Sequence, residues 1–124
     1  MKVLADTSVW VEYFRTGSVD QMDQLLEEDL IVTNDIILTE LIPALALQKQ
    51  TQVIESLTCL NLIPLQIDWE LIRRYQRLNL ENGINKVGIP DLIILQQTIE
   101  HSLILFSLDK HFRLMSNHYD FKLV

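Results

Sequence analysis

Cysteine is almost missing from this sequence, since Cys59 is the only one among 124 residues. A single cysteine cannot form a disulfide within the chain, so we expect a protein of the reducing cytoplasm. Glycine and proline are also scarce, at three residues each, and we find no low-complexity tract, repeat or linker. These features predict a single domain spanning residues 1–124.

Long apolar runs are missing as well. None reaches the roughly 18 residues that suggest a membrane-spanning helix. The opening stretch MKVLADTSVW meets an acid at Asp6. That is too early for the core of a signal peptide, which needs about 7–15 apolar residues. The hydrophobic fraction of 48% is instead sufficient for one buried core.

Basic residues are outnumbered, with 10 Lys and Arg against 17 Asp and Glu and a net charge of −7. This balance argues against a broadly basic coat for nucleic acid. It does not exclude nucleic-acid binding, because charge need not be evenly spread over the surface.

Short apolar runs alternate with segments of helical spacing along the whole chain. The runs predict strands at residues 2–5, 30–33, 60–65, 102–107 and 121–124. Asn34 (or Thr33) and Asp68 suit the caps of the helices that follow them. Most of the runs are continuously apolar, which is typical of a parallel sheet covered on both faces by helices. The expected class is therefore α/β, with ligands bound beyond the carboxyl ends of the strands.

Three aspartates stand where such a site would form. Asp6 and Asp109 follow predicted strands directly, and Asp91 opens a helix. Each has a simpler explanation, because Asp6 suits a helix cap, and Asp91 and Asp109 suit the positive ends of helix dipoles. Taken singly, each aspartate is better explained by that structural role than by catalysis.

Glu40 is harder to explain, because it lies in the apolar stretch NDIILTELIPALAL, residues 34–47. On a helix it shares a face with Ile36, Pro43, Ala44 and Leu47. We expect a buried carboxylate there, and no basic residue precedes Lys49 on that helix to pair with it. A nearby cation or a bound proton would offset the cost of burial.

A group of carboxylates without His or Cys predicts a site for Mg²⁺ or Mn²⁺, since zinc usually brings nitrogen or sulfur ligands. One or two such ions offset the repulsion between carboxylates, activate water and stabilise charge on a phosphate oxygen. That is the chemistry of phosphodiester cleavage.

Four segments together resemble the PIN-domain ribonucleases of the VapC toxin type. They are LADTSVW (4–10), TELIPAL (39–45), IPDLIIL (89–95) and LFSLDKHF (105–112), and the resemblance spans essentially the whole chain. It implies an α/β/α sandwich with a mostly parallel sheet. It also implies a Mg²⁺- or Mn²⁺-dependent endoribonuclease acting on tRNA, rRNA or mRNA, inhibited by a cognate antitoxin and commonly a homodimer.

The resemblance also implies roles for individual residues. The acidic site would consist of Asp6, Glu40, Asp91 and Asp109, with Asp6 and Asp91 the most direct metal ligands. In this hypothesis Glu40 completes the metal shell or orients the attacking water. Ser8 matches a small hydroxyl that holds the first carboxylate in place, and Ser107 stands where the family often has Thr or Ser. Local turn capping explains both serines as well.

The chain has less basic surface than many members of that family. Candidate contacts to RNA phosphates are Arg73, Arg74, Arg77 and Lys86, the three arginines lying close together on a helix. A solvated face with pairs such as Glu70–Arg74 explains them equally well.

The remaining polar and aromatic candidates have no such pattern. The three histidines lack the spacing of zinc ligands, so we interpret His101, His111 and His118 as surface or structural residues. We expect Trp10 and Trp69 to be core or interface aromatics.

Two alternatives to a nuclease stay open at this point. One is a catalytically weak PIN-fold protein that acts through a protein partner, although the presence of all four acids argues against it. The other is a phosphotransfer protein. It fits poorly, because a phosphatase of that kind needs a second Asp where Ser8 stands, and a receiver needs an acidic neighbour for Asp6.

Overall fold

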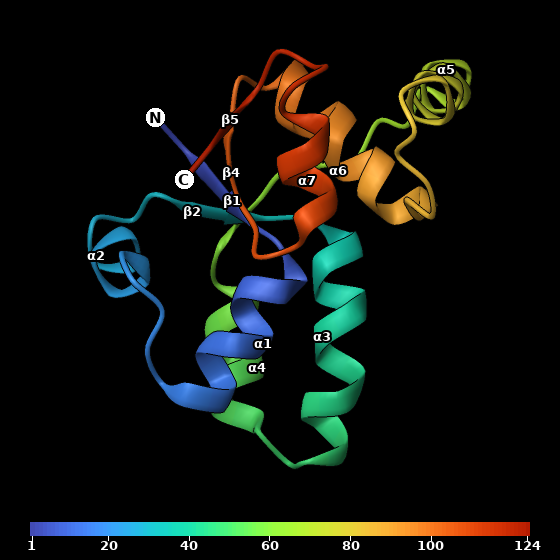
Figure 1. The fold of residues 1–124 in the computed structure, drawn as a ribbon. Helices are drawn as coiled ribbons and strands as arrows, with labels where there is room; N and C mark the ends of the chain where they lie inside the picture. The colour runs from blue at the N-terminus through green and yellow to red at the C-terminus, as the bar shows by residue number, and fades with distance from the viewer.

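Five parallel strands form one sheet in the computed structural model, which describes residues 1–124 (Figure 1). In sheet order they are β3 (Asn61–Leu62), β2 (Ile31–Thr33), β1 (Val3–Ala5), β4 (Ile104–Phe106) and β5 (Lys122–Leu123). Every neighbouring pair is parallel, as predicted. All five strands are shorter than expected, and β3 ends before Pro64, which has no N–H group for a ladder hydrogen bond.

Seven helices connect and cover the strands. They are α1 (Thr7–Thr16), α2 (Met22–Glu27), α3 (Asp35–Leu47), α4 (Thr51–Thr58), α5 (Trp69–Glu81), α6 (Ile89–Glu100) and α7 (Lys110–Met115). The arrangement is the expected α/β fold. None of the helices combines the length and the apolar character that a membrane crossing requires.

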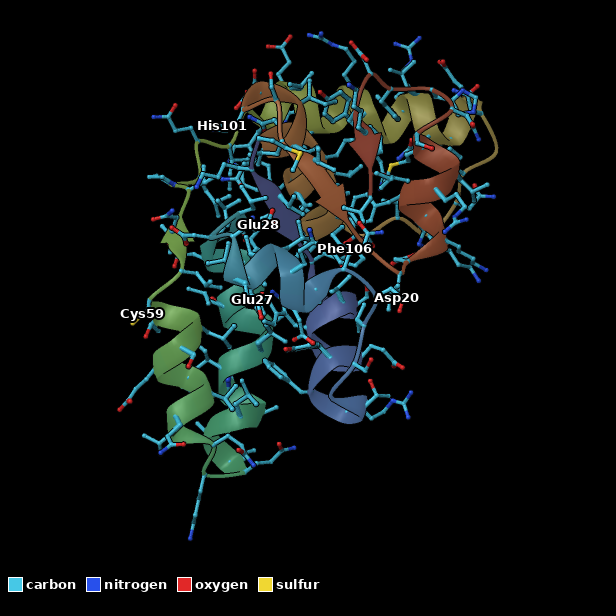
Figure 2. The ribbon with its side chains drawn as sticks, turned by 90° about the vertical axis from the view of Figure 1, so that its left-hand side faces the viewer. Asp20, Glu27, Glu28, Cys59, His101 and Phe106 are labelled. Atoms are coloured by element: carbon cyan, nitrogen blue, oxygen red, sulfur yellow. The ribbon has the colours of Figure 1, made fainter.

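Helices α1, α3 and α4 extend together beyond the sheet (Figure 1). The helices α3 and α4 form a hairpin, and α1 packs against α3. Cys59 is exposed at the end of α4, where Figure 2 shows it at the edge of the molecule. The three central strands β2, β1 and β4 lead into α3, α1 and α7, so the N-terminal ends of these helices lie beside one another.

Helix α6 lies at the centre of the protein. Every residue from Leu92 to Thr98 is buried, which is the behaviour of a helix that is covered on all sides. Its apolar residues Leu92, Ile94 and Leu95 belong to the same core as the side chains of β1 and β4. The first turn of α6 contains Asp91, which the buried remainder of the helix therefore holds in a fixed position.

A buried polar pair connects α6 to the start of α3. Asn34 caps α3, because its Oδ1 accepts a hydrogen bond from the Ile37 N–H at 2.9 Å. Its Nδ2 donates to Gln97 Oε1 at 2.7 Å, and Gln97 Nε2 donates to the Ile63 carbonyl at 3.0 Å. This pair joins the helix that contains Glu40 to the helix that contains Asp91.

Replacing Asn34 with alanine should lower the free energy of unfolding by roughly 2–3 kcal/mol, because a cap is lost and Gln97 is left with a buried acceptor unpaired. Urea denaturation followed by circular dichroism measures the effect. The matched control is Asp68→Ala, which removes the exposed cap of α5, where Asp68 Oδ1 accepts from the Leu71 N–H. That loss should be about 1 kcal/mol. Equal losses in the two variants would show that the bond to Gln97 contributes nothing.

Candidate metal centre

The four acids predicted from the sequence come from four different elements. Asp6 caps α1 directly after β1, and Asp109 caps α7 after β4. Glu40 lies in α3 and Asp91 in the first turn of α6. They lie close enough for the charges of Asp109, Asp6 and Glu40 to act on the carboxyl of Asp91. The Ser107 hydroxyl, which donates to Asp6, also accepts from the Asp109 N–H. The predicted grouping at the carboxyl ends of the strands is therefore present in the structure.

Asp6 is the most buried of the four, with 5% of its surface exposed. Its Oδ1 accepts hydrogen bonds from the Ser8 hydroxyl at 2.5 Å and from the Val9 N–H at 3.3 Å. Its Oδ2 accepts from the Ser107 hydroxyl at 2.5 Å. Burial raises the pKa of Asp6, and these hydrogen bonds partly oppose that rise. Asp6 is thus a helix cap, as its simpler explanation required, and also a member of the cluster.

Ser8 and Ser107 connect two turns that are far apart in the sequence. Ser8 Oγ accepts a hydrogen bond from the Leu108 N–H at 2.9 Å, and Ser107 Oγ accepts from the Asp109 N–H at 3.0 Å. Both hydroxyls also donate to Asp6. The proposed supporting role and the turn-capping role therefore coincide in the same two side chains.

Asp91 has the most strongly perturbed acid–base equilibrium in the cluster. Burial is the largest cause, followed by the negative charges of Asp109, Asp6 and Glu40, and together they raise the pKa of Asp91 to about 6. His111 acts in the opposite direction. No lysine or arginine forms an ion pair with any of the four acids. The repulsion between these carboxylates is thus without a basic side chain to offset it.

His111 lies beside Asp109, which the sequence analysis did not anticipate. Asp109 Oδ1 accepts from the His111 N–H at 2.9 Å and is 3.2 Å from His111 Nδ1. One ligand atom from each of Asp91, Asp109 and His111 lies within 4.8 Å of the others. The spacing of the three histidines along the sequence does not reveal this contact. The position of His111, two residues after the predicted metal ligand Asp109, does indicate it.

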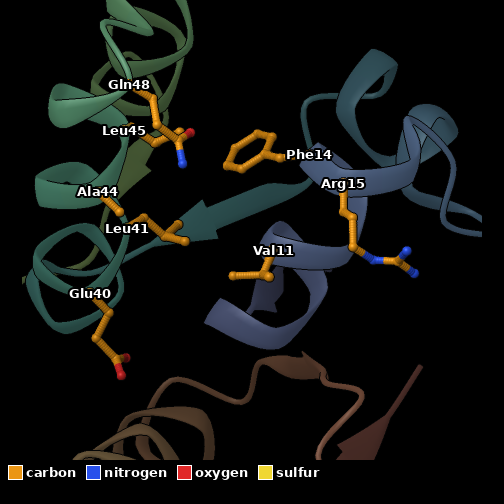
Figure 3. Close-up of a pocket in the computed structure, with 8 residues that line it drawn as sticks. All are labelled: Val11, Phe14, Arg15, Glu40, Leu41, Ala44, Leu45 and Gln48. Atoms are coloured by element: carbon orange, nitrogen blue, oxygen red, sulfur yellow. The ribbon is translucent and has the colours of Figure 1, made fainter.

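The expected burial of Glu40 is wrong. Its side chain is exposed, and Thr7 Oγ1 donates a hydrogen bond to Glu40 Oε1 at 2.9 Å. Figure 3 shows its carboxylate pointing away from the apolar residues of α3 and toward the C-terminal part of the chain. Pro43 and Leu47, on the same face of α3, are exposed as well, because this helix extends beyond the sheet. A missing ion-pair partner is therefore no reason to place a cation there.

The face of α3 next to Glu40 borders an open groove of about 410 Å³. Val11 and Phe14 of α1 line one side, and Leu41, Ala44 and Leu45 of α3 line the other (Figure 3). Of the apolar residues that share a face of α3 with Glu40, only Ala44 lines this groove, and Ile36, Pro43 and Leu47 lie outside it. Glu40 lies at the end of the groove that is closer to the other three acids.

The basic residues proposed to contact RNA are exposed but do not join the cluster. Arg73, Arg74 and Arg77 lie on α5, which packs against α6 and occupies the periphery in Figure 1. The pair Glu70–Arg74 is not formed, and Arg77 instead pairs with Glu81 at 3.0 Å. Lys86 lies in the loop before α6 with a φ of 63°.

The predictions for the two tryptophans and for the other two histidines have different outcomes. Trp10 is buried in the core, as expected. Trp69 is 50% exposed and lies outside the core, so its place at an interface stays a prediction. His101 and His118 are surface residues, as interpreted from the sequence.

The donor set fits a divalent cation. Asp91 and Asp109 offer carboxylate oxygens and His111 a ring nitrogen, all within 4.8 Å of one another. The buried Asp6 lies near this group without belonging to it, and both of its oxygens accept hydrogen bonds from serines. Asp91 is held in an environment that disfavours its charged form, and a cation would reverse that preference. A divalent ion held here would activate water and stabilise charge on a phosphate oxygen.

The comparison with protein families is decisive for the fold. The model of the PIN domain family matches residues 3–117. The chain belongs to the PIN domain family. No curated protein sequence is significantly similar to it.

Solved structures confirm the PIN fold over the full chain. A chain of the DNA-bound VapBC complex from Salmonella typhimurium superposes with a TM-score of 0.77 at 16% identity, covering 100% of this chain and 97% of that one. A chain of the promoter-bound VapBC2 complex from Rickettsia felis gives 0.75 at 20% identity, covering 100% and 98%. VapC20 from Mycobacterium tuberculosis, a toxin that cleaves the sarcin–ricin loop, gives 0.61 at 10% identity, covering 91% and 94%.

Proposed function

We propose that this PIN domain is a metal-dependent endoribonuclease and the toxin of a toxin–antitoxin pair, acting in the cytoplasm. The observation that carries the proposal is the cluster of Asp6, Glu40, Asp91 and Asp109 at the carboxyl ends of β1, β2 and β4, without a lysine or arginine to neutralise it. Membership of the PIN family supports a nuclease, and VapC20, which is similar in fold, is named as a toxin that cleaves the sarcin–ricin loop.

The role that we propose for each acid follows from how deeply its side chain is buried. Asp6, Asp91 and Asp109 would hold Mg²⁺ or Mn²⁺, since they are the less exposed members of the cluster. A bound ion would supply water activation and charge stabilisation at the scissile phosphate. Ser8 and Ser107 keep both oxygens of Asp6 in place by donating hydrogen bonds. Glu40 is open to solvent, and Thr7 orients it, so it suits the positioning of a water molecule.

Substrate contacts follow from the same arrangement. The acids repel an approaching RNA phosphate, so a basic surface nearby is needed to attract it. We propose that this surface consists of four residues outside the cluster, Arg73, Arg74, Arg77 and Lys86. Three of them have no ion-pair partner, and Arg77 shares its charge with Glu81. The chain carries net charge −7, so these four residues would be a local exception on an acidic surface.

Cleavage of an RNA pool tests the proposed activity. Purified protein should cut RNA when Mg²⁺ or Mn²⁺ is present and should lose that activity in excess chelator, with the cut sites mapped by sequencing the new ends. Equal cleavage with and without chelator would contradict the metal dependence. Absence of cleavage at every metal concentration would contradict the nuclease.

An antitoxin is the partner we propose. Four chains that share this fold come from VapBC structures, two of which contain DNA. The exposed apolar side chains of Val11 and Phe14 on α1 and Leu47 on α3 provide surface for an interface, with a second copy of the chain as a further partner. If co-expressed antitoxin bound the protein but RNA was never cleaved, the catalytically weak binding protein would be the better description.

A further inference from the structure

We infer that His111 supplies a nitrogen ligand to the proposed metal centre, which therefore prefers later first-row transition metals to Mg²⁺. The inference rests on the proposed function and specifies its metal. It begins from the position of His111, half-buried in the first turn of α7 beside the acids of α6 and of the β4–α7 turn.

The spacing of the donor atoms is close to that of a coordination shell. A ring nitrogen of His111 and one oxygen each from Asp91 and Asp109 lie within 4.8 Å of one another. Three evenly spaced ligands at about 2.1 Å from one ion are at most about 3.6 Å apart, so the three side chains must close by up to about 1 Å to meet on one ion. Side-chain rotations of that size are within reach at a half-buried surface.

The orientation of His111 is fixed by its neighbour. Its backbone N–H donates to Asp109 Oδ1, and its Nδ1 is 3.2 Å from the same oxygen. Asp109 Oδ2 accepts no hydrogen bond, so it is available for a metal. A separation of about 3 Å also suits two neighbouring ligands of one ion, so Asp109 and His111 are already placed to share it.

His111 also carries the only side-chain nitrogen within ion-pair distance of one of the four acids. The other two ion pairs of the protein, Arg15–Glu12 and Arg77–Glu81, lie elsewhere. Mg²⁺ favours a shell of oxygens, whereas imidazole strengthens the binding of Fe²⁺, Co²⁺, Ni²⁺ and Zn²⁺. One nitrogen among the oxygens therefore shifts selectivity without removing the ability to bind Mg²⁺.

Pulsed EPR of Mn²⁺ bound to the whole protein tests coordination directly, independently of activity. Protein labelled with ¹⁵N-histidine should show a change in the nitrogen modulation of the Mn²⁺ signal, compared with unlabelled protein, and this modulation should be missing in His111→Gln. The control is His118→Gln, which alters an exposed histidine outside the cluster and should leave the modulation unchanged.

Calorimetric titration with Co²⁺ and with Mg²⁺ tests selectivity. In His111→Gln the Co²⁺ affinity should fall about 10–100-fold and the Mg²⁺ affinity by no more than about threefold. Asp91→Ala should instead weaken both metals. Titration of His118→Gln should match the unmodified protein.

Two outcomes separate this inference from the proposed function. If Mn²⁺ binds but shows no histidine nitrogen, or if His111→Gln weakens Co²⁺ and Mg²⁺ equally, His111 only holds Asp109 and the inference is wrong while the metal-dependent nuclease stands. If no divalent cation binds the unmodified protein, both fail together.

Discussion

Asp91→Asn should lower metal-dependent RNA cleavage by about a thousandfold, because it removes a charged oxygen from the ions that would act on the phosphate. The fold should survive, since an amide of the same shape occupies the first turn of α6 and the buried residues that follow are unchanged. Asp6→Asn should have a loss of similar size. Rates of cleavage of one end-labelled RNA, with circular dichroism as the check on folding, measure both variants.

Asp20→Asn is the matched control, because Asp20 is an exposed acid between α1 and α2 (Figure 2). It removes the same charge from the protein outside the cluster and should cleave like the parent. If Asp91→Asn retained more than about a tenth of the parent rate, Asp91 would not be a metal ligand and the assignment of the centre would need revision.

The second large effect is on the free energy of unfolding of the metal-free protein. The pKa of Asp91 in the folded protein is about 6, compared with an ordinary value of 3.8. A raised pKa means that folding favours the protonated acid, so this contribution to stability is fully present below about pH 4 and is lost as the pH rises through about 6. After allowing for solvent screening of this half-buried group, we expect a loss of about 2 kcal/mol in chelator.

The difference between parent and Asp91→Asn isolates this effect. Urea denaturation in chelator at pH 4.5 and at pH 8 should show the variant gaining about 2 kcal/mol over the parent at the higher pH. Saturating divalent cation should reverse the order at pH 8, because the ion stabilises only the charged carboxylate. A constant difference between the two proteins over this range of pH would contradict the raised pKa.

Much of the fold was predictable because short apolar runs and helical spacing are local properties. The order of strands and helices, the parallel sheet and the caps at Asn34 and Asp68 follow from neighbouring residues. The strand lengths were overestimated, because apolar runs continue past the last ladder hydrogen bond into turns. The acids were predictable for the same local reason, since three of the four lie directly after a strand or at the start of a helix.

The environment of individual side chains was less predictable. The exposure of Glu40 depends on how far α3 extends beyond the sheet, and helical spacing says nothing about that distance. His111, at the start of α7, meets Asp91, in the first turn of α6, across 20 positions of sequence. Thr7 reaches Glu40 across 33 positions. Such contacts depend on tertiary structure, so the sequence alone identified the acids but not what surrounds them.

The hydroxyl of Ser107 makes one hydrogen bond as a donor and another as an acceptor. Its single proton is donated to Asp6, so its contact with the Asp109 N–H must be one in which the oxygen accepts. Ser8 repeats the pattern, donating to Asp6 and accepting from the Leu108 N–H. A side chain at position 8 or 107 must therefore donate one hydrogen bond and accept another at the same time. Threonine is the replacement that keeps a hydroxyl on Cβ, which donates and accepts as serine does. Alanine, valine or asparagine at position 107 would break the hydrogen-bonded link between the Asp6 carboxylate and the backbone of Asp109.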